Sequence, residues 1–190
     1  MQTPTHVLIA AAAFARPGGG AINAAALAGG FLPDAFLFAA WGWSKIAGVS
    51  EEAFWSQHYW TDDIQLGQAI SNSFPLFGAL LAASLVFIWR AASIFAGAGL
   101  IHLVCDFALH AKDAHRHFWP VSDWRFQSPL SYWDPVHFGV YVGLAEATLG
   151  CALIVLVFRR FRALWIRSLL LVAGAAYPAV LIYFLIALDG

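Results

Sequence analysis

The sequence is poor in charged residues, in cysteine and in methionine. Only 11% of its 190 residues are charged, whereas 61% are hydrophobic. Soluble domains carry about 25% charged residues, so this composition indicates an integral membrane protein. The net charge of −1 and the lack of a basic patch argue against a nucleic-acid partner. The two cysteines, Cys105 and Cys151, lie in apolar runs, which favours buried thiols over a disulfide.

Long apolar runs divide the chain into helices. We expect an all-α, polytopic membrane helix bundle that forms a single membrane-embedded domain over residues 1–190. A short helix over residues 3–15 should precede five transmembrane spans, because about 20 residues are needed to cross a bilayer. The spans are expected at residues 21–43, 66–89, 91–110, 136–158 and 163–188. They leave a polar loop at 44–65 and an aromatic loop at 111–135.

The arginines indicate how the bundle is oriented. Arg16, Arg90 and the cluster from Arg159 to Arg167 fall at turns on one side of the predicted membrane. Positively charged residues concentrate on the cytoplasmic side of membrane proteins. The loop at 111–135 is therefore expected on the non-cytoplasmic side.

Histidines and acidic residues concentrate in one stretch, from Ile101 to Gly139. Five of the seven histidines lie there: His102, His110, His115, His117 and His137. The i, i+4, i+8 spacing of His102, Asp106 and His110 places them on one helix face. Ionisable side chains inside a membrane span are costly unless they meet a partner or a metal. This stripe is therefore a candidate functional site.

Other predicted helices bring polar residues to the same depth. Counted from the cytoplasmic turns, His6, Asp34, His102, Asp106 and Glu146 lie at about 15–24 Å. Histidine with carboxylate, without clustered cysteine, suits a divalent transition metal: zinc first, with manganese or iron as alternatives. Because His102 and His110 are about 12 Å apart along a helix, one ion does not suit both, and two ions bridged by Asp106 are an alternative to a single ion. The alternative is that these groups have a purely structural role and only make hydrogen bonds between packed helices.

Further roles follow from position. Glu146 or Asp113 is a candidate general base, and His110 or His117 a candidate acid or electrostatic stabiliser. His110 is also a candidate metal ligand. Arg125 is available for an anionic headgroup, and Asn72 lies near the outer mouth as a second substrate-binding candidate. His115 is expected to be a plain loop histidine, and His58, in a tryptophan-rich loop, an interfacial one. Asp113 and His117 share a face only if the helix continues past His110.

Three short motifs resemble a known family. Thr5-His6, Gly30-Phe-Leu-Pro-Asp34 and His102-Leu-Val-Cys-Asp106 are similar in type and order to motifs of bacterial inner-membrane proteins described as predicted metal-dependent hydrolases. The resemblance covers about half of the chain. It implies a multi-span helical protein of the bacterial inner membrane, with His6, Asp34, His102 and Asp106 as metal-site candidates. The chain departs from the family pattern after His110.

The expected function is therefore a membrane-embedded, metal-dependent hydrolase that acts on a lipid or another membrane-soluble substrate. Such an ion lowers the pKa of a bound water toward neutrality. The alternative is a non-enzymatic metal-binding membrane protein, either a transporter or a subunit that holds a metal or haem in a larger complex. An open coordination position facing an outer cavity favours the enzyme, and a closed, saturated site favours the alternative.

Overall fold

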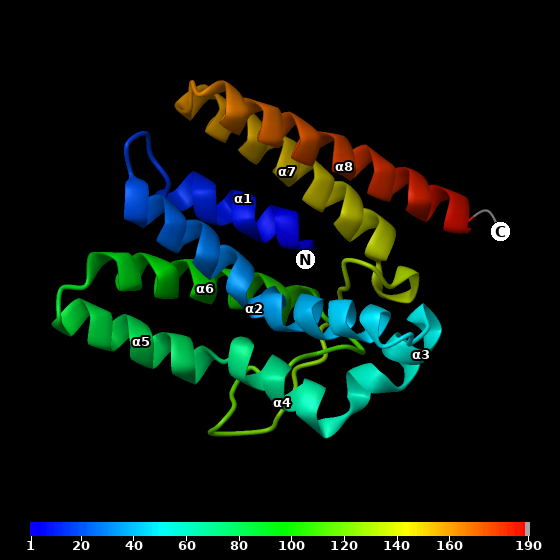
Figure 1. Ribbon diagram of the computed structural model, residues 1–190. Coiled ribbons are helices and arrows are strands. Elements are labelled where there is room, and N and C mark those ends of the chain that lie inside the picture. The colour runs from blue at the N-terminus through cyan, green and yellow to red at the C-terminus, as the bar shows by residue number, and fades with distance from the viewer. Residues whose placement is uncertain (189–190) are drawn as a thin grey trace.

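The protein is a helix bundle, seen in a computed structural model that describes residues 1–188, without the side chains of 176, 179–181 and 183–188 (Figure 1). No strand occurs in these residues. The elements are α1 (Thr3–Phe14), α2 (Gly20–Ile46), α3 (Glu51–Ser56), the 3-10 turn η1 (His58–Trp60), α4 (Asp62–Ser71), α5 (Phe74–Val86), α6 (Arg90–Leu109), the 3-10 turn η2 (Pro135–His137), α7 (Gly139–Arg160) and α8 (Leu164–Leu188).

The prediction of a membrane helix bundle is confirmed. Four segments are long and apolar enough to cross a membrane: α2, Asp62–Val86 (α4 with α5), α6 and α7. α1 is a shorter apolar helix, as expected from its sequence. The predicted fifth span, 163–188, lies partly outside the described side chains, and its described part is a shorter apolar helix, Leu164–Ala175.

α1 lies at the centre of the arrangement although it is short. It packs against α2, α6 and α7, and α7 in turn pairs with α8 (Figure 1). Small residues permit this close approach: a side chain on Gly30 of α2 would collide with Ala10 and the backbone of His6. The Gly30 contact therefore brings the His6 turn of α1 directly against α2.

The segment 44–65 is not the simple polar loop that we expected. α2 continues to Ile46, and α3, η1 and the start of α4 occupy the rest. The Ser50 hydroxyl accepts a hydrogen bond from the Ala53 amide and caps α3. Ser50 and the acidic residues at the start of α3 are polar, but they are polar in the pattern that begins a helix.

The predicted span 66–89 is interrupted. α4 ends at Ser71 and α5 begins at Phe74, where the Ser73 hydroxyl accepts a hydrogen bond from the Leu76 amide. Pro75 sits in the first turn of α5, where its missing N–H costs nothing. Pro33, by contrast, lies inside α2 without ending it, and its carbonyl accepts a hydrogen bond from the Asn72 amide nitrogen.

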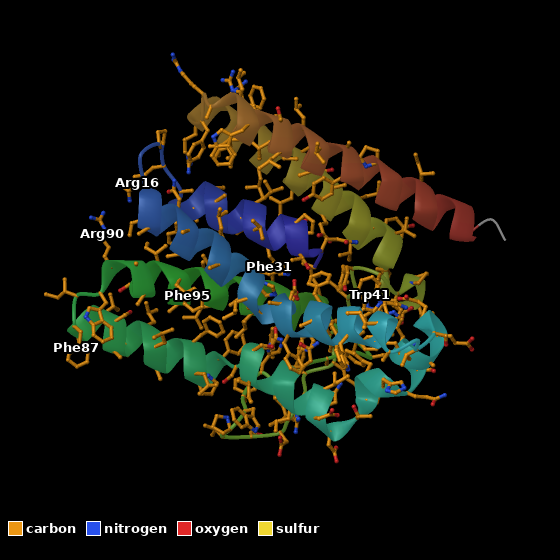
Figure 2. All side chains as sticks on the ribbon, in the orientation of Figure 1. Arg16, Phe31, Trp41, Phe87, Arg90 and Phe95 are labelled. Carbon is orange, nitrogen blue, oxygen red and sulfur yellow. The ribbon has the colours of Figure 1, made fainter. Side chains whose placement is uncertain are left out.

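The two ends of the bundle differ in character. Arg16 and Arg90 lie at one end, away from Trp41 (Figure 2). α6 stops at Leu109, so Asp113 and His117 do not share a helix face. The segment 111–135 is irregular, yet it is held to the bundle by backbone hydrogen bonds from Ser128 to His110 and from Phe74 to His117. Several histidines of this segment are thereby buried next to the end of α6.

Candidate metal centre

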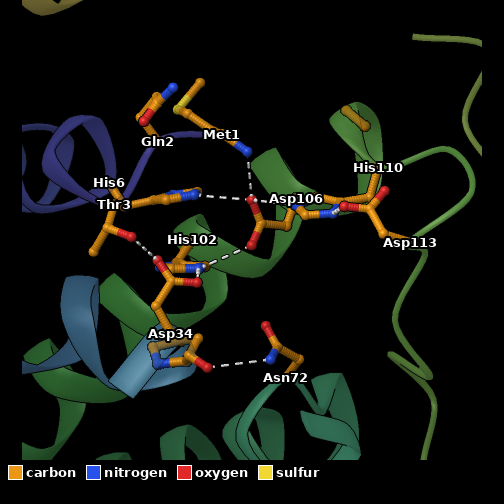
Figure 3. Close-up of polar contacts among 12 residues, drawn as sticks. Met1, Gln2, Thr3, His6, Asp34, Asn72, His102, Asp106, His110 and Asp113 are labelled. Carbon is orange, nitrogen blue, oxygen red and sulfur yellow. Dashed lines mark hydrogen bonds and ion pairs between the residues drawn. The ribbon is translucent and has the colours of Figure 1, made fainter. Parts of the chain in front are cut away.

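The carboxylate of Asp106, on α6, is the shared centre of the polar cluster. Its Oδ1 lies 2.9 Å from His6 Nε2 and 3.4 Å from His110 Nε2, and its Oδ2 lies 3.0 Å from His102 Nε2 (Figure 3). The Met1 amino group also lies 2.9 Å from Oδ1. Asp106 is only 1% exposed. A buried carboxylate in contact with three imidazoles is arranged to hold positive charge.

His6, His102 and Asp106 form the first ligand group. Their ligand atoms lie within 4.8 Å of one another, and all three residues are buried. The rings of His6 and His102 stack with their centroids 3.5 Å apart. Asp34, on α2, approaches the group with its Oδ1 3.6 Å from His102 Nε2. The Thr3 hydroxyl donates to the other oxygen of Asp34 at 2.6 Å. This arrangement brings together all four residues that the family resemblance implies.

Asp106, His110 and His115 form a second ligand group with the same spacing limit, also fully buried. The ring centroids of His110 and His115 are 4.7 Å apart, and that of His117 lies 5.5 Å from His115. His115 was expected to be a loop histidine, but it is buried beside the end of α6. Sequence reasoning missed it because the loop has no periodicity. The available signal was the pair His115 and His117 directly behind His110.

Three of these histidines are oriented by a partner on the outer side of the ring. His102 Nδ1 donates to the Gly30 carbonyl at 2.8 Å, and His117 Nδ1 donates to the Asn72 carbonyl at 2.9 Å. His110 Nδ1 lies 2.9 Å from Asp113 Oδ2. Since a carbonyl can only accept, Nδ1 of His102 and of His117 carries a proton, and in the neutral ring Nε2 carries the lone pair that a metal would use. Metal-binding histidines are fixed in this way by partners on the other ring nitrogen.

The loop groups have the protonation states that metal binding requires. Burial, with a smaller effect of the neighbouring His110 and His117 in the same direction, lowers the pKa of His115 to about 3. Burial likewise lowers the pKa of His117 to about 4. Burial raises the pKa of Asp113, but the hydrogen bonds from His110 and Trp133 and the nearby histidine charges together outweigh burial and bring the pKa to about 2. At neutral pH the two imidazoles are neutral and Asp113 is charged.

A cavity of about 630 Å³ opens beside the cluster. Asp34, His110, Asp113 and His115 line it, together with Lys112. Its other walls are largely aromatic and apolar: Leu37, Phe38, Trp55, Tyr59, Trp60, Tyr132 and Trp133, with Met1, Gln2 and Thr3 at the side of α1. Of the ligand candidates, His6, His102 and Asp106 do not line the cavity in the described part of the chain. The second ligand group is therefore the one that faces the open space.

The two substrate-binding candidates, Arg125 and Asn72, make hydrogen bonds to other parts of the protein. The Arg125 guanidinium donates to the Ala114 carbonyl and to Gln65 Oε1, both at 2.8 Å. The Asn72 amide donates to the carbonyls of Pro33 and Gln68. Neither residue lines the cavity. A substrate-binding role for either stays a prediction, while their observed contacts join the loop 111–135 to α2 and α4.

Glu146, on α7, is buried but belongs to neither ligand group. Its Oε1 accepts hydrogen bonds from the Gln2 amide and from the Thr5 hydroxyl, both at 2.7 Å. These groups lie at the start of α1, where free amides and the helix dipole favour a negative charge. The contacts of Glu146 therefore hold α1, and its predicted role as a general base stays a prediction.

The geometry of these two groups is the basis for assigning a function, since no family model, no curated protein and no solved structure matches this chain.

Proposed function

We propose that this protein is a membrane-embedded, metal-dependent hydrolase that acts on a lipid or another membrane-soluble substrate. One observation carries the proposal: two groups of histidine and carboxylate ligands share Asp106, and one of them faces a cavity with largely aromatic walls. The motif resemblance to predicted metal-dependent hydrolases of the bacterial inner membrane supports the same activity and location.

The donor set fits a divalent transition metal. His102 Nδ1 donates to the Gly30 carbonyl, so in the neutral ring its Nε2 directs a lone pair at Asp106 and Asp34. A lone pair that faces carboxylate oxygens is repulsive unless a proton or a cation lies between them. Nitrogen and oxygen ligands without sulfur suit zinc first, with manganese or iron as alternatives. The bound ion would supply Lewis acidity and a more acidic water.

Asp113 is the group best placed to take a proton from water. It lines the cavity, and its Oδ2 accepts hydrogen bonds from His110 Nδ1 and from the Trp133 indole, both at 2.9 Å. Its Oδ1 has no hydrogen-bond partner among the described residues. One oxygen therefore holds the carboxylate in place and the other remains an unused acceptor. A free acceptor oxygen is one of the features that a general base needs.

The cavity walls suit a substrate with an apolar portion. Phe38, Trp55 and Trp133 offer aromatic surface, and Lys112 is a side-chain cation among the lining residues. Lys112 pairs with Asp134 at 3.1 Å and remains largely exposed. We propose that Lys112, rather than the engaged Arg125, meets an anionic substrate group.

The function is tested on purified protein with two reporters, a long-chain p-nitrophenyl ester and a p-nitrophenyl phosphodiester. We expect hydrolysis that a chelator abolishes and that added zinc or manganese restores. Asp113→Asn should retain the metal and lower turnover by about 10²–10⁴-fold, because it removes the proton acceptor. His58→Ala is the control, since His58 lies on η1 outside the cavity.

Other results would point away from hydrolysis. Protein that binds metal but turns over neither reporter, with Asp113→Asn indistinguishable from wild type, would favour the non-enzymatic alternative, a transporter or a subunit of a larger complex. Protein that binds no transition metal would contradict both functions.

We also propose that the cavity opens on the non-cytoplasmic side, because Arg16 and Arg90 lie at the other end of the bundle (Figure 2). Ser128 is unsuitable as a reporter of this topology, since it is only 4% exposed. Val121 is 81% exposed in the same loop. In a variant without Cys105 and Cys151, Val121→Cys should react with a membrane-impermeant maleimide in intact cells. Ala163→Cys, in the turn between α7 and α8, should react only after lysis. The reverse pattern would invert the topology.

A further inference from the structure

We infer that the site holds a second cation, the outer ion, bound by Asp106, His110 and His115 and adjoined by His117. The first ion belongs to His6, His102 and Asp106, and the outer ion is the one exposed to substrate in the cavity. The inference rests on the proposed metal-dependent function. It extends the site to residues that lie beyond the three sequence motifs described above.

The ligand atoms of this outer group are gathered without any help from the first group except the Asp106 carboxylate. His110, His115 and Asp106 place one ligand atom each within 4.8 Å of the others. His110 Nε2 is turned toward Asp106 Oδ1 at 3.4 Å, while its Nδ1 is held by Asp113. A histidine held between a carboxylate and a ligand position is a common arrangement at metal sites.

His117 supplies the independent sign that a cation belongs here. Its Nδ1 donates to the Asn72 carbonyl, so its Nε2 is an acceptor. That Nε2 is buried and has no hydrogen-bond partner among the described residues. A buried acceptor without a partner is unfavourable, because it has lost its hydrogen bond to water. The His117 ring lies beside His115, so a cation in the outer group would be a partner for the Nε2 lone pair.

The two groups differ in access. His110 and His115 line the cavity, whereas His6 and His102 do not in the described part of the chain. Catalytic metal positions keep an open coordination site, and structural positions are closed by protein ligands. The geometry therefore assigns substrate contact to the outer ion and an anchoring role to the inner one, with Asp106 as the bridge between them.

The test is cobalt stoichiometry and spectroscopy of the full chain. Wild-type protein should bind about two Co²⁺ per chain, with visible absorption bands that shift when azide is added, because azide can reach an open position. His115→Gln should bind about one Co²⁺, and its bands should no longer respond to azide. His137→Gln is the matched control, since His137 is another histidine of this region but pairs with Asp134.

A second measurement tests the outer ion without the His115 variant, in case His115→Gln does not fold. Manganese-loaded wild type should show an electron paramagnetic resonance spectrum broadened by coupling between the two neighbouring ions. His117→Gln should weaken outer-ion binding about 10–100-fold and should therefore show the narrow spectrum of one ion. One cobalt per chain in wild type, with an azide response that His115→Gln retains, would overturn the outer ion and leave the single-metal function intact. Wild type that binds no cobalt would overturn both.

Discussion

Asp106→Asn will release essentially all bound metal, because both ligand groups depend on this one carboxylate. The substitution keeps the size of the side chain but replaces one acceptor oxygen with an N–H donor. That donor would face the imidazoles of His6, His102 or His110, which lie 2.9–3.4 Å from the present oxygens. No other carboxylate contacts all three rings among the described residues.

The same change should destabilise the fold. Removing one partner of a buried charged network costs about 3–5 kcal/mol, since the remaining polar groups stay buried without compensation. The measurements are metal content by elemental analysis and thermal unfolding in detergent. Asp123→Asn is the matched control: Asp123 is exposed and pairs with Arg116 at the surface, so metal and stability should stay at wild-type values.

His102→Gln separates the loss of metal from the loss of fold. It removes one ligand of the inner group and leaves Asp106 with His110 and His115. We expect partial metal retention and a smaller loss of stability than in Asp106→Asn. Full metal retention in Asp106→Asn would show that Asp106 is a hydrogen-bonding residue and not a bridge.

The sequence was informative where helix geometry alone decides the outcome. His102, Asp106 and His110 had to share a face, because the i, i+4 spacing of a helix does not depend on the surrounding fold. The convergence of His6 and Asp34 on that face followed from counting residues along apolar helices of similar depth. The structure brings both to the predicted place.

Equal depth did not determine which way a side chain turns. Glu146 was predicted to face the imidazoles, but its carboxylate meets the start of α1, at the Gln2 amide and the Thr5 hydroxyl. The rotation of a helix about its axis depends on packing, which no single-helix pattern reveals. His115 escaped prediction for a related reason: its position depends on how the irregular loop returns beneath α6, through contacts such as Ser128 to His110.

α7 holds α1 by charges of opposite sign at its two ends. Glu146 accepts hydrogen bonds at the start of α1, and Arg160 Nη1 donates to the carbonyls of Ala11, Ala12 and Ala15 at 2.6–3.2 Å. The fourteen-residue separation from Glu146 to Arg160 spans about 21 Å, close to the length of about 18 Å for α1. Each charge also has the sign that the helix dipole favours at that end.

These contacts of Glu146 and Arg160, the α7 clamp, explain how so short a helix holds His6 in a fixed position. α1 has no side-chain cap of its own at its first residue, so Glu146 and Arg160 replace the caps that the local sequence lacks. The position of His6 against Asp106 should therefore depend on α7, although no α7 residue belongs to either ligand group in the described chain.

Arg160→Met should loosen α1, although Arg160 itself belongs to neither ligand group. Hydrogen bonds to charged groups contribute about 1.5–3 kcal/mol, so the amides of α1 should exchange with deuterium about 10–100-fold faster. Arg159→Met is the matched control, because Arg159 is the exposed neighbour on the same helix. Glu146→Gln should likewise speed exchange in α1 and weaken binding of the inner ion, because Glu146 holds the start of the helix that carries His6. If Glu146 is instead the general base, Glu146→Gln will keep wild-type exchange and full metal occupancy while turnover is lost, and the clamp will then rest on Arg160 alone.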